Sequence, residues 1–106
     1  MTVMRFRQAI VSALADEMRE DSKVMLFGED VAHAEGPFKT SEGLLAEFGS
    51  LRVRDTPISE MAFTGAAVGA AIMGMKPVVE IMFMEFLGVA LDQLVTEAAK
   101  MRYLSN

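Results

Sequence analysis

Four segments with helical spacing of their apolar residues alternate with three short apolar runs, and this alternation is the feature that most constrains the fold. The predicted helices cover residues 6–20, 41–48, 57–74 and 85–104, and the predicted strands cover 24–27, 51–54 and 77–83. The run Val24–Phe27 has no polar residue, which is typical of a strand buried on both faces of a parallel sheet. Alternation of this kind predicts an α/β fold, with a mostly parallel sheet flanked by helices.

Three parallel strands form only a small sheet, and both of its edges would be exposed. A chain of 106 residues is also no longer than one small domain. We therefore expect residues 1–106 to form an incomplete domain.

Composition excludes several classes of function. Hydrophobic residues make up 52% of the chain, so a packed core is expected. Ten Lys and Arg against fifteen Asp and Glu give a net charge of −5, which argues against a nucleic-acid partner. With no cysteine and one histidine, no metal site is predicted. The apolar stretch 61–75 is too short to span a membrane. We expect a cytoplasmic protein without a membrane partner.

The run Asp55–Glu60 carries the first candidate residue. Thr56 is predicted to be the N-cap of the apolar helix, with Pro57 at its first position and Glu60 close to its start. A glutamate there complements the helix dipole, which is worth about 0.3–1 kcal/mol. Alternatively, a carboxylate heading a buried helix lies in low dielectric and needs a hydrogen-bonding partner, such as a ligand nitrogen. Spacing alone favours the first interpretation and leaves the second open.

Other candidates follow the predicted strands, where ligands of open α/β sheets bind. Glu29 comes directly after the first strand, although a solvated loop is the commoner explanation for such a position. Met82 and Phe86 flank the end of the third strand, where they would either wall a pocket for a flat ring or pack in the core. Glu80 lies within that apolar strand, as a paired buried carboxylate or at an edge position.

Six motifs occur in order along the chain. They are Gly28–Val31, Phe38–Leu44, Arg52–Glu60, Gly65–Ala71, Lys76–Glu80 and Asp92–Tyr103. Together they resemble the β subunit of the thiamine-diphosphate-dependent E1 component of 2-oxo acid dehydrogenase complexes, a group that includes pyruvate, branched-chain and acetoin dehydrogenases. The resemblance covers essentially the whole chain, and it corresponds to the start of the pyrimidine-binding domain of such a subunit.

This resemblance implies a thiamine diphosphate site between an α and a β subunit. The α subunit would hold the diphosphate and Mg²⁺, and the β subunit would hold the aminopyrimidine. Glu60 matches the glutamate that hydrogen-bonds the pyrimidine ring nitrogen and so favours the imino tautomer that removes the thiazolium C2 proton. Phe86 matches the aromatic residue that packs on the aminopyrimidine, Ile58 and Met82 match pocket-wall positions, and Glu29 matches a carboxylate near Glu60.

The resemblance also implies partners. They are an E1 α subunit and a second β subunit in a heterotetramer, and a lipoyl E2 core that receives the acyl group. The helix containing Gly65 and Gly69 would be an inter-subunit packing surface. The family's later catalytic histidine has no counterpart within these residues, so the chain alone is not expected to complete an active site.

Alternatives remain at this point. The loop Ala32–Gly36 departs from the form common in relatives, which leaves pyruvate, branched-chain and acetoin types open. The chain is alternatively a catalytically inactive remnant that acts only in subunit association. A transketolase-like synthase is disfavoured by the close match of Asp55–Glu60.

Overall fold

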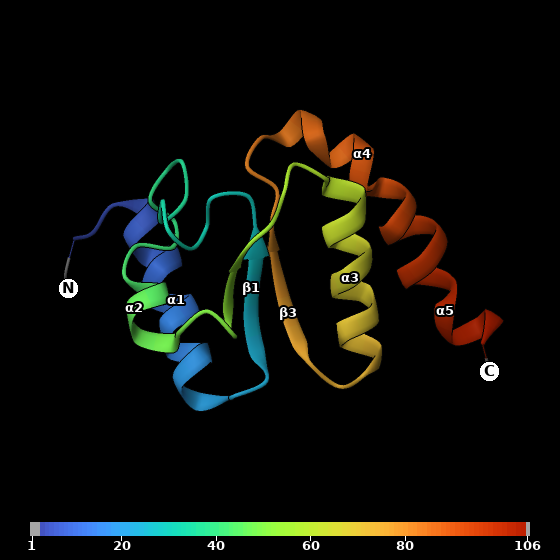
Figure 1. Ribbon diagram of the computed structural model, residues 1–106, viewed down its shortest axis with the longest axis horizontal. Coiled ribbons are helices and arrows are strands. Elements are labelled where there is room, and N and C mark those ends of the chain that lie inside the picture. Colours follow the sequence, from blue (N-terminus) through green and yellow to red (C-terminus); the bar gives the residue numbers. More distant parts are fainter. Residues whose placement is uncertain (1–2, 106) are drawn as a thin grey trace.

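The computed structural model describes residues 3–105, which form a three-layer α/β arrangement (Figure 1). Its elements are α1 (Phe6–Glu20), β1 (Val24–Gly28), α2 (Leu44–Phe48), β2 (Val53–Asp55), α3 (Glu60–Ile72), β3 (Lys76–Glu80), η1 (Met84–Phe86), α4 (Leu87–Leu91), η2 (Asp92–Ala98) and α5 (Ala99–Leu104). α1 and α2 cover one face of the sheet and α3 covers the other, while the C-terminal helices pack against α3 (Figure 1). The predicted fold class is confirmed.

The sheet is parallel throughout, in the order β2-β1-β3. Gly28 at the end of β1 pairs with Asp55 on one side and with Glu80 on the other. All three carboxyl ends therefore meet at one edge of the sheet, the upper end of the arrows in Figure 1.

The central strand divides the core into two clusters. All five residues of β1 are buried. Leu26 packs with Met18, Leu44 and Val53 on the face covered by α1 and α2, while Phe27 packs with Met25 and Ala67 on the α3 face. Each large apolar side chain buried in this way contributes about 1.5–3 kcal/mol. β1 is thus the doubly buried strand that the sequence predicted.

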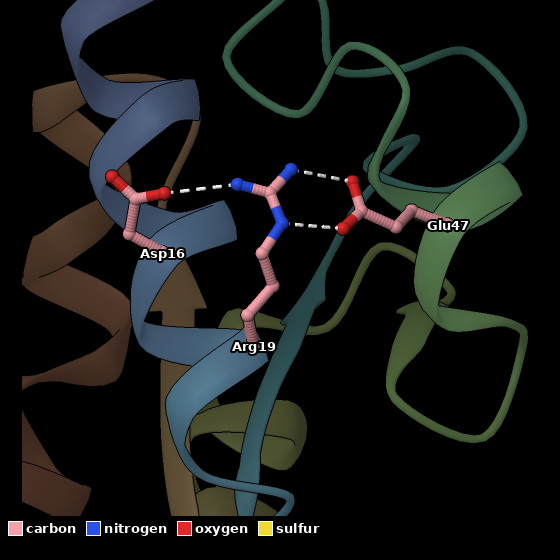
Figure 2. Close-up of polar contacts among 3 residues, drawn as sticks. All are labelled: Asp16, Arg19 and Glu47. Atoms are coloured by element: carbon pink, nitrogen blue, oxygen red, sulfur yellow. Dashed lines mark hydrogen bonds and ion pairs between the residues drawn. The ribbon is translucent and has the colours of Figure 1, made fainter.

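A polar contact on the surface joins the two helices of the first face. Arg19 on α1 donates from Nε and Nη2 to the two carboxylate oxygens of Glu47 on α2, at 2.6 and 2.8 Å (Figure 2). Its Nη1 donates to Asp16 at 2.9 Å. Because these side chains are well exposed, solvent screens the ion pair. The contact orients α2, while the buried apolar cluster supplies most of the stability.

α3 begins later than predicted. Ser59 is its N-cap residue, so the prediction that Thr56 caps the helix, with Pro57 at its first position, is wrong. The Thr56 N–H donates to the Gly28 carbonyl at 2.9 Å, which continues the β1–β2 pairing and holds Thr56 in the strand direction. The Ser59 hydroxyl donates to the Pro57 carbonyl rather than serving as a cap acceptor. The first helical residue is therefore Glu60 itself.

The apolar surface of α3 is only partly covered by the described residues. The helix packs against β3 and against α4 and η2, which agrees with burial on more than one side. Phe63, Thr64 and Ala67 are buried, whereas Met61 and Ile72 remain exposed. No helix within residues 3–105 has both the length and the apolar character needed to cross a membrane.

Other boundaries also differ from the predictions. α2 starts at Leu44 rather than residue 41, because Gly43 adopts φ 79° and interrupts the helix. β2 starts at Val53 rather than residue 51, and Leu51 and Arg52 lie in the preceding turn. β3 ends at Glu80 rather than residue 83, since β1 ends opposite Glu80 and offers no further pairing.

The predicted helix 85–104 is not one regular helix. It starts as the 3-10 turn η1, continues as α4, widens to the π-helix η2 and ends as α5. Gln93 on η2 lies over Gly65 on α3, and a Cβ atom at residue 65 would come within 2.6 Å of Gln93 Oε1. The absence of a side chain at Gly65 leaves the space that the Gln93 side chain occupies.

Candidate functional site

The five residues singled out from the sequence all follow the carboxyl ends of the strands. Glu29 comes directly after β1, Ile58 and Glu60 follow β2, and Met82 and Phe86 follow β3. The parallel register brings these three segments to one edge of the sheet (Figure 1). This edge is where ligands bind in open α/β sheets.

Glu29 and Glu60 form a buried carboxyl pair. They are 7% and 8% exposed, respectively, so the solvated-loop explanation does not hold for the Glu29 side chain. Loss of solvent raises the pKa of Glu29 above its usual 4.5, and the negative charge of the neighbouring Glu60 raises that pKa further. The Ser59 backbone N–H works in the opposite direction. Burial beside Glu60 therefore favours the neutral form of the Glu29 carboxyl over its charged form.

Glu29 retains unused hydrogen-bonding capacity. Its Oε1 atom is buried and has no partner among residues 3–105. Leaving a buried polar atom unpaired is costly, and such atoms concentrate at functional sites. Asp30, by contrast, is exposed and adopts a positive φ of 57°, so it turns the chain away from the sheet.

An open hollow of about 580 Å³ lies beside the start of α3. Ile58, Glu60 and Gly65 line one side of it, and Val89 and Gln93 line the other. Ile58 is 84% exposed and stands at the rim. Of the five predicted residues, only Ile58 and Glu60 border this hollow.

Sequence reasoning did not single out Val89 or Gln93. The two residues are four apart on one helical face, and Gln93 is the polar member of that face. The observation that identifies Gln93 is that its side chain lies over Gly65 on α3, and this contact is visible only in the packed structure.

Phe86 belongs to a separate aromatic row. Its ring centroid lies 5.7 Å from that of Phe83 at an interplanar angle of 84°, and Phe83 lies 5.6 Å from Phe38 at 80°. Phe86 is 37% exposed, so it is not a core residue. Met82 is half-buried. We refer to Phe38, Phe83 and Phe86 as the aromatic row; sequence reasoning identified only its last member.

Glu80 ends the edge strand β3 and is hydrogen-bonded. The Thr40 hydroxyl donates to Glu80 Oε2, across forty residues of chain. The edge alternative for Glu80 therefore holds, because β3 is an edge strand, and its half-buried carboxylate is partnered through one oxygen.

Asp55 organises the loop after β1. Its carboxylate accepts the backbone N–H groups of Ala32 at 2.6 Å and His33 at 3.2 Å, and it lies 2.8 Å from His33 Nδ1. Partial burial raises the pKa of Asp55, but the hydrogen bonds from His33 and Ala32 outweigh this effect and bring it below the usual 3.8. The ionised side chain is thus the form that holds the loop.

The arrangement offers a buried carboxyl pair, an open hollow and a partly exposed aromatic ring at one edge. These groups suit a flat, nitrogen-containing heterocycle, which needs a hydrogen-bonding partner for a ring nitrogen and an apolar surface for its face. None of the residues lining the hollow is basic, so they offer no cationic side chain there for a diphosphate.

Comparison with known proteins gives consistent matches along the chain. Residues 2–106 match the family model described as "Transketolase, pyrimidine binding domain". The chain is 46% identical over 106 residues to the 2-oxoisovalerate dehydrogenase subunit beta of Bacillus subtilis (strain 168), and 51% identical over 103 residues to the mitochondrial pyruvate dehydrogenase E1 component subunit beta of Saccharomyces cerevisiae. Identity to the pyruvate dehydrogenase E1 component subunit beta of Rhizobium meliloti (strain 1021) is 47% over 106 residues.

These matches cover 97–100% of the chain but only 23–32% of the three relatives. The chain thus spans about a quarter to a third of the length of the curated relatives that it matches.

Proposed function

Because the chain belongs to the transketolase pyrimidine-binding domain family, we propose that it is the aminopyrimidine-binding part of a 2-oxo acid dehydrogenase E1 β subunit, of the pyruvate dehydrogenase type. On this proposal, residues 1–106 are a partial pyrimidine-binding domain. The observation that carries it is the buried Glu29–Glu60 pair beside an open hollow, in a chain that is similar over its whole length to proteins named E1 β subunits.

Thiamine diphosphate, when bound, would supply the thiazolium that accepts electrons as the 2-oxo acid loses carbon dioxide. Glu60 would share a proton with the ring nitrogen of the aminopyrimidine. Glu29 would keep a proton behind it, because its raised pKa favours the neutral form. A protonated Glu29 that donates to Glu60 leaves one negative charge in the pair instead of two, which permits both carboxyl groups to be buried.

Three further residues would hold the ring. Phe86 would pack against the aminopyrimidine, and its partly exposed side chain supports this role. Ile58 and Met82 would form walls, one following β2 and the other following β3. These apolar groups would also exclude water from the carboxyl pair, which strengthens its interaction with a ring nitrogen.

The rest of the site would lie on other chains. We propose that an E1 α subunit holds the diphosphate and its Mg²⁺, that a second β subunit completes a heterotetramer, and that a lipoyl E2 core receives the acyl group. The names of the relatives as subunits of an E1 component and the lack of basic side chains around the hollow support this division.

Replacing Glu60 with glutamine tests the proposed role. In an assembly of this chain with its α partner, Glu60→Gln should preserve assembly and lower decarboxylation by about 10²- to 10⁴-fold, the usual contribution of a positioned proton-transfer group. Glu42→Gln is the matched control, because Glu42 is exposed and makes no side-chain hydrogen bond within residues 3–105. Turnover near the wild-type rate in Glu60→Gln would rule out this role for Glu60.

The substrate is a separate question. Relatives of both the 2-oxoisovalerate and the pyruvate type match the chain at similar identity. We propose a preference for pyruvate, and competition between pyruvate and 2-oxoisovalerate in the same assembly measures it as a ratio of kcat/KM values. A ratio that favours the branched substrate would assign the chain to the branched-chain type. A cytoplasmic location stays a prediction, since the yeast relative is named as mitochondrial.

A role in association alone is the second candidate. Its specific support is the set of apolar side chains left exposed on the helices after β3, such as Leu94, Val95 and Leu104. Calorimetry of the assembly with thiamine diphosphate and Mg²⁺ separates the two candidates. Binding that requires this chain and weakens in Phe86→Ala supports the cofactor role, whereas assembly without any cofactor binding supports association alone.

A further inference from the structure

We propose that Phe38 and Thr40 are positioning residues, which hold the segment 81–86 so that the Phe86 ring faces the aminopyrimidine. The inference rests on the proposed function, because it assigns that role to Phe86. Both residues lie on the loop between β1 and α2, far in sequence from the segment that they contact.

The first contact is aromatic. Phe38 meets Phe83 edge to face, with centroids 5.6 Å apart, and Phe83 meets Phe86 in the same way at 5.7 Å. Edge-to-face geometry is directional, so the orientation of each ring restricts that of the next. Phe38 is thus coupled to Phe86 through one intervening ring.

The second contact is polar. The Thr40 hydroxyl donates to Glu80 Oε2, and Glu80 is the last residue of β3. The other carboxylate oxygen of Glu80 is buried without a partner within residues 3–105. Thr40 and Phe38 therefore fix the segment on both sides of Met82, at Glu80 and at Phe83.

The loop that makes these contacts is itself anchored. Its Ser41 hydroxyl is fully buried and donates to the Val31 carbonyl at 2.6 Å. The Gly36 N–H donates to the Asp30 carbonyl at 2.7 Å. Because the loop between β1 and α2 is held in place by these hydrogen bonds, its contacts can restrict the position of the segment 81–86.

Exposure separates this role from core packing. Phe38 is 53% exposed and Phe83 is 42% exposed, so neither ring belongs to the buried clusters. Removing the Phe38 ring should leave the fold intact and change the orientation of Phe86.

Fluorine NMR of the full chain with 4-fluorophenylalanine at position 86 tests the coupling directly. Phe38→Leu and Thr40→Val should each shift or broaden the Phe86 resonance, while Phe38→Tyr and Thr40→Ser should restore it, because they keep the ring and the hydroxyl. Phe6→Leu and Thr96→Val are matched controls that should leave the resonance unchanged, since both residues are exposed and neither belongs to the aromatic row.

A second measurement uses the assembly with its α partner. Phe38→Leu should weaken thiamine diphosphate binding by about 2- to 10-fold, the change expected when one edge-to-face ring pair is lost. The kcat at saturating cofactor should remain near the wild-type value, because Phe38 touches no reacting group.

An unchanged Phe86 resonance in both Phe38→Leu and Thr40→Val overturns the inference, whatever the cofactor does. A shifted resonance with unaltered cofactor affinity also overturns it, because the ring would then move without consequence for binding. A wild-type assembly that binds no thiamine diphosphate instead overturns the proposed function, and the fluorine signals still decide whether Phe38 and Thr40 fix the ring.

Discussion

Gly28 ends the central strand where the candidate site begins, and changing it to alanine tests how closely the chain packs there. An alanine Cβ would lie 2.7 Å from Val31 Cγ1, 3.1 Å from the Glu80 carbonyl oxygen and 3.2 Å from Glu80 Cβ. Carbon atoms pack favourably at about 3.5–4.0 Å, so each approach is too short. The Glu80 carbonyl belongs to the paired strand β3 and cannot rotate away as a flexible side chain could.

The expected cost follows from these contacts. Forcing an extra methyl group into a packed region costs about 1–3 kcal/mol. Alanine also restricts the unfolded chain, which returns about 0.4–1 kcal/mol. We therefore expect Gly28→Ala to lower the free energy of unfolding by about 1–2 kcal/mol. Urea denaturation followed by circular dichroism measures this as a lower midpoint with an unchanged slope.

Gly69→Ala is the matched control, because a Cβ there would meet no heavy atom within 4 Å. Gly69 lies inside α3, where alanine is favoured over glycine by about 0.8–1.0 kcal/mol. The same chemical change should thus stabilise the chain at residue 69 and destabilise it at residue 28. A Gly28→Ala variant as stable as the wild type would refute the close packing of the sheet edge.

Three further predictions concern the residues around the site. The wild-type chain should lose stability as pH rises from 4.5 to the folded-state pKa of Glu29, because the raised pKa means that the folded state binds more protons than the unfolded state in this range. Glu29→Gln should abolish this pH dependence, and thermal melts across the range measure it. Asp55 should have the opposite effect, because its lowered pKa contributes stability that is complete above pH 3.8 and is lost as pH falls through the folded-state pKa. Asp55→Asn should abolish this loss of stability at low pH, and an acid titration that shows no difference from the wild type would contradict this. Ser41→Ala should cost about 1–3 kcal/mol, because it leaves the buried Val31 carbonyl without its side-chain donor, and a urea midpoint equal to that of the wild type would count against the hydrogen bond.

The sequence predicted the elements best where burial is local to the chain. The all-apolar run Val24–Phe27 became the doubly buried central strand. Boundaries failed where a distant segment supplied the deciding contact. Thr56 has the side chain of a helix cap, but the Gly28 carbonyl from another strand accepts its N–H and keeps it extended. β3 ends at Glu80 because its partner strand β1 ends opposite that residue, and the residue pattern of 77–83 does not indicate where β1 ends.

The candidate site shows the same division. Sequence patterns identified Glu60, Glu29 and Phe86 as candidates, but spacing alone favoured a helix-dipole role for Glu60 and a solvated loop for Glu29. Their proximity depends on the parallel register that aligns the ends of β1 and β2. The sequence did not predict a role for Phe38 or Gln93, because the residues that they contact, Phe83 and Gly65, are distant in sequence.

Periodicity and apolar runs are properties of neighbouring residues, so they predict the layered α/β fold, the central strand and the types of residue at the carboxyl edge. The burial of Glu29 and Glu60 as a pair, and the link from Phe38 through Phe83 to Phe86, instead arise from contacts between segments that are distant in sequence. The physical reason is that a carboxyl pKa or a ring orientation depends on desolvation and on contacts between segments, and these exist only after the strands have paired and the helices have packed on them.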